Sequence, residues 1–98
     1  MGKSIPVTIG DKHFSKKGDA HLYFKEILNR YFLGDTVSNP EHAFLVAALS
    51  KHPEYEEKTG AGISHFTIEK APDHGTRCFW VNRIDGTKID FSYKSCIN

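Results

Sequence analysis

The sequence predicts an α+β fold: a short N-terminal β-hairpin, two antiparallel helices and a three-stranded antiparallel β-meander. Three observations predict it. Apolar and polar residues alternate near the N-terminus and again after residue 62, which is the period of strands. Between these regions, apolar residues recur every three or four positions, which is the period of helices. The length of 98 residues suits one domain, spanning residues 1–98.

The first predicted element is a hairpin. Residues 5–9 and 12–14 flank the dipeptide Gly10-Asp11. A two-residue Gly-Asp loop suits a type I′ or II′ turn. This turn would place Val7 opposite Phe14.

A long helix is predicted next, over about residues 17–33. Ser15 is the expected N-cap, and Gly34 stands where a left-handed C-cap belongs. The apolar residues of this segment fall on one helical face: Ala20, Phe24, Ile27, Leu28, Tyr31 and Phe32.

A second helix is predicted to begin at Asn39-Pro40-Glu41, which supplies a cap residue, a proline in the first turn and an acid near the positive dipole end. His52 extends its apolar stripe, and Pro53 ends the helix because the residue before a proline avoids helical geometry. The stripe consists of Phe44, Leu45, Ala48 and Leu49.

After a connector over 54–62, three strands are predicted at about 63–70, 77–83 and 87–92. The last two are joined by Ile84-Asp85-Gly86, a three-residue loop with glycine third, which suits a type I turn closed by a glycine bulge. The resulting register pairs Val81 with Ile89, Phe79 with Phe91, Trp80 with Asp90 and Arg77 with Tyr93. Phe66 and Ile68 join the same apolar face from the first strand.

The opposite sheet face is predicted to be polar, with Trp80 near its centre. Two interpretations of this tryptophan stay open. An exposed indole among hydrogen-bonding groups is typical of a binding surface. Alternatively, the hairpin or the connector packs over the ring and makes a second small core. The other residues of this face are His65, Thr67, Glu69, Cys78, Asn82, Lys88, Asp90 and Ser92.

Charge and composition exclude several classes. The net charge is +1, so a basic field over the whole molecule is absent. Residues 1–17 carry +3 and residues 63–98 carry +1, whereas residues 18–62 carry −3. No apolar run is long enough to cross a bilayer and no secretory signal is visible, so we expect a cytoplasmic location and no membrane partner. Cys78 and Cys96 are expected to be reduced, buried thiols.

No catalytic motif, cofactor motif or metal-ligand spacing is found, and we expect no cofactor, no metal and no enzymatic activity. One enzymatic alternative remains, a metal-dependent nuclease using Asp73, Asp85, Lys88 and His52. However, Asp85-Gly86 is also explained by turn chemistry. His52 itself has two interpretations: a histidine at the core edge whose ring bonds a backbone carbonyl, or a functional group.

Several motifs taken together resemble the DCL (defective chloroplasts and leaves) family. The likeness runs from about Phe14 to Ile97, with Thr59 at a position where an aliphatic residue is expected. The motifs are His52-Pro53, Lys58-Thr59-Gly60-Ala61-Gly62, Arg77-Cys78-Phe79, Arg83-Ile84-Asp85-Gly86 and Asp90-Phe91-Ser92-Tyr93-Lys94-Ser95-Cys96.

This resemblance implies a link to RNA. Plant members of the family include a plastid protein needed for ribosomal RNA maturation, and a related domain ends the largest subunit of a plant RNA polymerase. We therefore expect a non-catalytic module that binds RNA or supports its processing. The alternative is a protein–protein module of ribosome assembly or transcription that docks through the acidic helix pair. The expected RNA-contacting residues are Trp80 for stacking and Lys58, Arg77, Arg83, Lys88, Lys94 and His52 around it.

Overall fold

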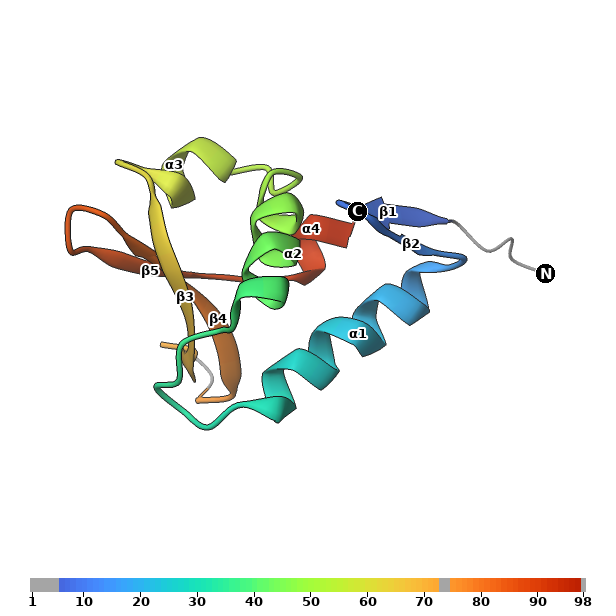
Figure 1. The fold of residues 1–98 in the computed structure, drawn as a ribbon, viewed down its shortest axis with the longest axis horizontal. Coiled ribbons are helices and arrows are strands. Elements are labelled where there is room, and N and C mark those ends of the chain that lie inside the picture. The colour runs from blue at the N-terminus through green and yellow to red at the C-terminus, as the bar shows by residue number, and fades with distance from the viewer. Residues whose placement is uncertain (1–5, 73–74, 98) are drawn as a thin grey trace.

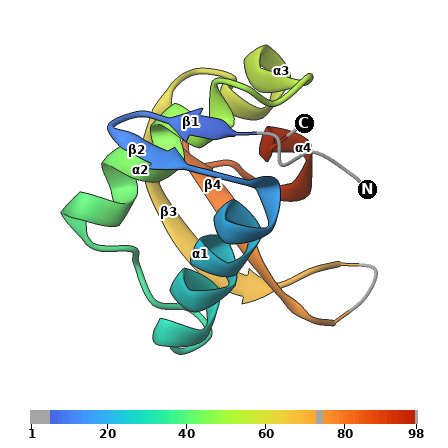
Figure 2. The same cartoon turned by 90° about the vertical axis from the view of Figure 1, so that its right-hand side faces the viewer.

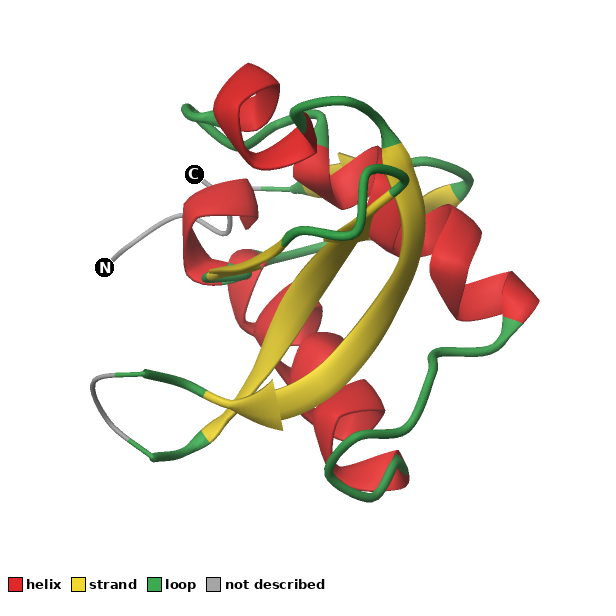
Figure 3. Cartoon of the chain, turned by 90° about the vertical axis from the view of Figure 1, so that its left-hand side faces the viewer, coloured by secondary structure: helices red, strands yellow, loops and turns green. Residues whose placement is uncertain are grey.

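A computed structural model describes residues 6–72 and 75–97 and confirms the α+β class. The two long helices lie on one side of a three-stranded sheet, and seen from the left-hand side of Figure 1 the sheet stands in front of them (Figures 1 and 3). In chain order the elements are β1 (Val7–Ile9), β2 (Lys12–Phe14), α1 (Lys17–Arg30), α2 (Asn39–Leu49), α3 (Tyr55–Thr59), β3 (Ile63–Lys70), β4 (Arg77–Arg83), β5 (Lys88–Phe91) and α4 (Lys94–Ile97).

Among the helices of the described ranges, none combines the length and the apolar character that crossing a bilayer requires.

The hairpin forms as predicted, with Val7 opposite Phe14. Gly10 has a φ of +59° while Asp11 does not have a positive φ, which fits the type II′ alternative. Val7 and Ile9 are buried, and the Phe14 ring contacts the rings of Tyr23 and Phe44 on the long helices. The hairpin therefore packs on the helices (Figure 2), and the prediction that it could cover Trp80 is wrong.

The first long helix is shorter than predicted. It ends at Arg30, and Phe32, which was expected in its buried stripe, lies outside it with 79% of its surface exposed. The predicted caps are also wrong. Lys16 occupies the N-cap position, with the Ser15 hydroxyl bonded to the Asp19 side chain instead, and Gly34 lies beyond the C-cap.

The early end of α1 has a cause in the sheet. The chain after α1 runs along the free edge of β3: Gly34 donates to the Ile68 carbonyl, Ile68 donates to the Asp35 carbonyl and Val37 donates to the Phe66 carbonyl. These backbone bonds require extended geometry and cannot coexist with a continued helix. They also cover one sheet edge, which would otherwise be open to pairing with another chain.

A buried carboxylate fixes the corner between the two long helices. Glu41, only 8% exposed, accepts hydrogen bonds from Arg30 and Tyr31, and from the Ser38 hydroxyl at 2.9 Å. Burial alone would raise the pKa of Glu41, but these hydrogen bonds and the nearby guanidinium lower it below its ordinary value.

Two short helices were not predicted. α3 lies inside the segment that was expected to be a connector, and α4 follows β5 and contacts both long helices. Cys96 and Ile97 of α4 are buried in the main core, as expected for Cys96, and burial raises the pKa of the Cys96 thiol to about 12.

The meander has the predicted register. Val81 pairs with Ile89, and Phe79 with Phe91, so the apolar face points toward the helices and its aromatic rings are buried. The predicted pairing of Arg77 with Tyr93 is wrong, because the ladder ends at Phe79 and Phe91 and the chain then turns into α4. A gap is thereby left beside the first residues of β4.

Candidate functional site

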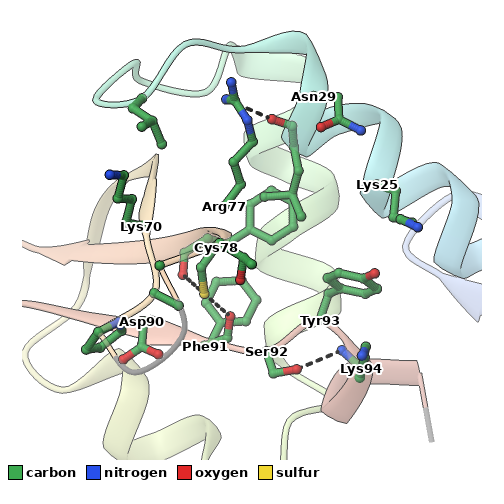
Figure 4. A pocket seen from close by; sticks show the side chains of 17 residues that line it. Lys25, Asn29, Lys70, Arg77, Cys78, Asp90, Phe91, Ser92, Tyr93 and Lys94 are labelled. Atoms are coloured by element: carbon green, nitrogen blue, oxygen red, sulfur yellow. Dashed lines mark hydrogen bonds between the residues drawn. The ribbon is translucent and has the colours of Figure 1, made fainter.

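This gap opens into a groove of about 800 Å³ that described residues form (Figure 4). Its walls come from α1, from both ends of the β3–β4 connection, from the first residues of β4, from the end of β5 and from the segment that leads into α4. Leu33 and Tyr93 provide accessible apolar surface, with the buried Leu28, Phe79 and Phe91 behind it, and Asn29, Thr76 and Ser92 provide polar groups. This volume lies within the range of pockets that bind small molecules.

The groove is strongly cationic. Four exposed basic side chains line it, and each comes from a different element: Lys25 from α1, Lys70 from β3, Arg77 from β4 and Lys94 from α4. Asp90 is the carboxylate among its lining residues. Among the lining residues that the structure describes, four cations face one anion, and a concave surface with this excess of positive charge attracts anionic ligands.

Arg77 connects the groove to α1. Its Nη1 donates to the Tyr31 carbonyl at 2.5 Å and lies 3.5 Å from the Leu28 carbonyl. These carbonyls belong to the end of α1, where a cation also interacts favourably with the helix dipole. Arg77 therefore stabilises the helix end, and the guanidinium keeps further N–H groups for a ligand.

Cys78 lies in the middle of the groove (Figure 4). Its Sγ lies 3.3 Å from the Phe91 carbonyl, to which the thiol donates. Burial, together with the negative charge of Asp90, raises the pKa of this thiol. The protonated thiol is a poor nucleophile, so Cys78 fits a role in shaping the groove.

Trp80 lies on the outer face of the sheet and is half-buried. Its Nε1 donates to the Lys70 carbonyl at 3.2 Å, and the Lys88 ammonium lies 5.3 Å from its ring centroid. Lys88 also forms an ion pair with Glu69 at 2.7 Å, and this bond and one from Thr67 lower the pKa of Glu69. The indole thus adjoins Lys70, whose side chain lines the groove.

Another predicted contact residue, Arg83, caps the end of α3. Of the four carbonyls at the end of this helix, Gly60 and Gly62 bond two through their backbone N–H groups. Arg83 bonds the other two, with Nε 3.1 Å from the Lys58 carbonyl and Nη2 2.9 Å from the Glu57 carbonyl. A Cβ on Gly60, whose φ is +55°, would lie 2.7 Å from the Arg83 Nε, so the glycine makes room for the guanidinium.

The Lys58 side chain is also used within the fold. It is only 14% exposed, and its ammonium donates to the Asp90 carbonyl at 2.9 Å, which ties α3 to β5. Most of the Lys58-Thr59-Gly60-Ala61-Gly62 motif and Arg83 therefore join α3 to the sheet.

His52 is buried, and its ring packs at a steep angle to the ring of Phe91. Its Nδ1 accepts a hydrogen bond from the Glu54 backbone N–H at 3.0 Å, so the expected bond to a carbonyl is replaced by one to an amide. Burial is the main cause that lowers the pKa of His52, the nearby Lys58 charge adds to it, and Glu54 opposes it.

The seven predicted contact residues therefore do not form one site. Arg77 and Lys94 line the groove, Trp80 and Lys88 lie together beyond Lys70, and the other three bond within the fold. The groove residues Lys25 and Lys70 were missed, because a lone lysine on a helix or at a strand end gives no signal in a sequence.

The described residues of the nuclease alternative, Asp85, Lys88 and His52, do not form one cluster. Asp73 lies outside the described residues, and Asp85 accepts hydrogen bonds from the backbone and hydroxyl of Thr87 within its turn. Lys88 is paired with Glu69, and His52 is buried against Phe91. Within residues 6–72 and 75–97, no three His, Cys, Asp or Glu side chains are placed to hold a metal ion.

Comparison with known proteins places this architecture in a family. Residues 25–97 match the family model described as "Protein of unknown function (DUF3223)". The solution NMR structure of an uncharacterized protein from Rhodospirillum rubrum has a TM-score of 0.88 and 45% identity, covering 99% of this chain and 92% of that one.

Curated relatives carry the same region within longer proteins. Protein EMBRYO DEFECTIVE 514 of Arabidopsis thaliana is 35% identical over 98% of this chain and 48% of its own length. DNA-directed RNA polymerase IV subunit 1 of the same plant is 33% identical over 98% of this chain and 7% of its own length. Protein DCL, chloroplastic, of Solanum lycopersicum is 39% identical over 69% of this chain and 31% of its own length. The chain thus spans less than half the length of these relatives.

Proposed function

The chain belongs to the DUF3223 family and, with it, to the DCL family, and from this premise we propose that it is a non-catalytic RNA-binding accessory module of RNA processing or transcription. One observation carries the proposal: Lys25, Lys70, Arg77 and Lys94 converge from four elements on one groove. Relatives that include an RNA polymerase subunit support this context, since their machinery handles RNA.

The proposed interface extends from the groove across Lys70 to Trp80. Phosphates contact the groove cations, and a base stacks on the indole, which contributes about 1–3 kcal/mol per base. Lys88 lies over that ring, but a partly exposed ion pair such as Lys88–Glu69 is worth only about 0–1 kcal/mol, so Lys88 can move aside and bind phosphate. Direct RNA contact by Lys58, Arg83 and His52 stays a prediction.

A salt titration with a short single-stranded RNA tests the proposal. Affinity should fall with rising salt, and the slope of log K against log salt should decrease by about 0.7 for each phosphate contact removed by Lys25→Ala or Lys94→Ala. Lys51→Ala is the matched control, because this exposed lysine follows α2 and does not line the groove. Absence of binding at low salt, or binding that salt does not change, would refute the proposal.

A protein partner is the second candidate, and one observation favours it. Phe32 and Leu33, adjacent at the corner after α1, are 79% and 47% exposed. Neighbouring exposed apolar side chains mark protein contacts more often than scattered single ones do. Retention of a transcription protein after nuclease treatment, lost in Phe32→Ser but kept in Lys94→Ala, would favour this candidate.

The cytoplasmic location expected from the sequence stays a prediction, and the tomato relative is named chloroplastic.

A further inference from the structure

Asp90 has an unusual position for a carboxylate. It lies in a groove lined by four cations, yet it is absent from the ion pairs found among the described residues, which are Arg30–Glu41, Lys58–Glu54 and Lys88–Glu69. Lys58 bonds the backbone carbonyl of Asp90, which fixes the residue but leaves its carboxylate for other donors. A half-buried carboxylate beside a cavity is a ready acceptor for hydrogen bonds from a ligand.

The arrangement of charges defines the kind of ligand. Figure 4 shows Asp90 on one side of the groove, with Lys25, Tyr93 and Lys94 on the other. A fitting ligand carries an anion at one end and N–H donors at the other, joined by a body that tolerates the apolar wall of Tyr93. A nucleotide has this distribution, with a phosphate, a sugar and a flat base.

The carboxylate also selects among the bases. Guanine presents N1–H and N2–H side by side, and a carboxylate accepts both in the two-pronged manner in which it accepts a guanidinium. Adenine and cytosine place a ring acceptor beside their amino group, and uracil flanks its one N–H with two carbonyls. These acceptors repel a carboxylate, so guanine is the base that fits Asp90 best.

Resting on the proposed RNA-binding function, we propose that the groove binds one unpaired guanine nucleotide. Asp90 accepts from N1–H and N2–H of the base, and Lys25 and Lys94 contact the phosphate. The groove volume suits one nucleotide rather than a duplex. Duplex RNA is excluded for a second reason, since Watson–Crick pairing occupies N1–H and N2–H. The site therefore selects single-stranded RNA, because only an unpaired guanine has N1–H and N2–H free for Asp90.

The test is a set of NMR titrations of the ¹⁵N-labelled chain with GMP, AMP, CMP and UMP at one ionic strength. GMP should bind tightest, by roughly tenfold over UMP, which is the discrimination that one bidentate contact provides. Shifts should appear at Cys78 and over residues 90–94. Equal binding of the four nucleotides, or shifts confined to other surfaces, would overturn the inference.

Asp90→Asn separates base recognition from simple charge attraction, because the two explanations predict opposite changes in the affinity for GMP. If Asp90 recognises guanine, this change weakens GMP roughly tenfold and leaves the other nucleotides equal or tighter. If the groove only attracts phosphate, removing a negative charge strengthens all four nucleotides alike, which overturns the inference. Glu26→Gln is the matched control, since it removes an exposed carboxylate of α1 outside the groove.

Further measurements distinguish failure of this inference from failure of the proposed function. Lys25→Ala with Lys94→Ala should weaken all four nucleotides while the preference for GMP persists; loss of the preference would count against the assigned roles. Salt-dependent RNA binding without guanine preference overturns the guanine site and leaves the RNA-binding function standing. Absence of binding to both RNA and nucleotides overturns both.

Discussion

Replacing Arg83 by methionine distinguishes a structural arginine from an RNA-binding one. Arg83 donates three hydrogen bonds: two to the carbonyls of Glu57 and Lys58, and one to the Thr87 hydroxyl at 3.1 Å. Buried hydrogen bonds from a charged donor contribute about 1.5–3 kcal/mol each, and these contribute only about 1 kcal/mol each because Arg83 is only half-buried. Since methionine keeps the aliphatic packing, we expect Arg83→Met to lower the free energy of unfolding by about 2–4 kcal/mol.

The measurement is urea denaturation followed by circular dichroism, together with thermal melting. For a domain of this size, a loss of about 2–4 kcal/mol corresponds to a Tm lower by roughly 10–25 °C. Lys94→Met is the control, and as an exposed lysine it should change stability by less than about 0.5 kcal/mol. Arg83→Lys should lie in between, because lysine keeps the charge but cannot reach two carbonyls with a planar fork. An Arg83→Met variant as stable as the wild type that no longer binds RNA would refute the capping role.

Two further predictions concern the same end of the molecule. The Thr59 hydroxyl is buried without a hydrogen-bond partner among the described residues, so Thr59→Val should raise the free energy of unfolding by about 1 kcal/mol, and an unchanged urea midpoint would contradict this. His52 has a lowered pKa in the folded chain, so its contribution to stability is complete above its unfolded pKa of about 6.5 and is lost as pH falls through the lower, folded value. Protonation of Nδ1 would also remove its bond from Glu54. The Tm should thus fall between about pH 7.5 and about pH 5.5, and a smaller fall in His52→Asn than in the wild type would confirm the cause.

The parts of the fold that the sequence could predict are those set by local rules. A three-residue loop ending in Gly86 allows only the register that keeps Phe79, Val81 and Phe91 on one face, and this register is found. The hairpin pairing of Val7 with Phe14 follows in the same way from its two-residue turn. Each result depends on residues only a few positions apart.

The parts that could not be predicted depend on contacts between distant residues. α1 ends early because the following residues bond the edge of β3, which lies roughly thirty residues further along the chain. Phe32 is apolar at a helical spacing and is nevertheless exposed, since the chain has already left the helix at Tyr31. The groove is another long-range product, because it exists only where β5 stops short and exposes the start of β4.

Charged side chains in this protein serve two purposes, because some stabilise the fold and others line the groove. Lys58 and Arg83 were expected to contact RNA, and in the structure both side chains bond groups that join α3 to the sheet. Residues that hold a short helix on a sheet are needed for the fold, so we expect relatives to share them whatever those relatives bind. Side chains that converge on the groove without being needed for the fold, such as Lys25 and Lys94, are therefore the more informative ones. A relative that keeps the α3 cap but lacks these lysines should fold in the same way and bind RNA with a weaker dependence on salt.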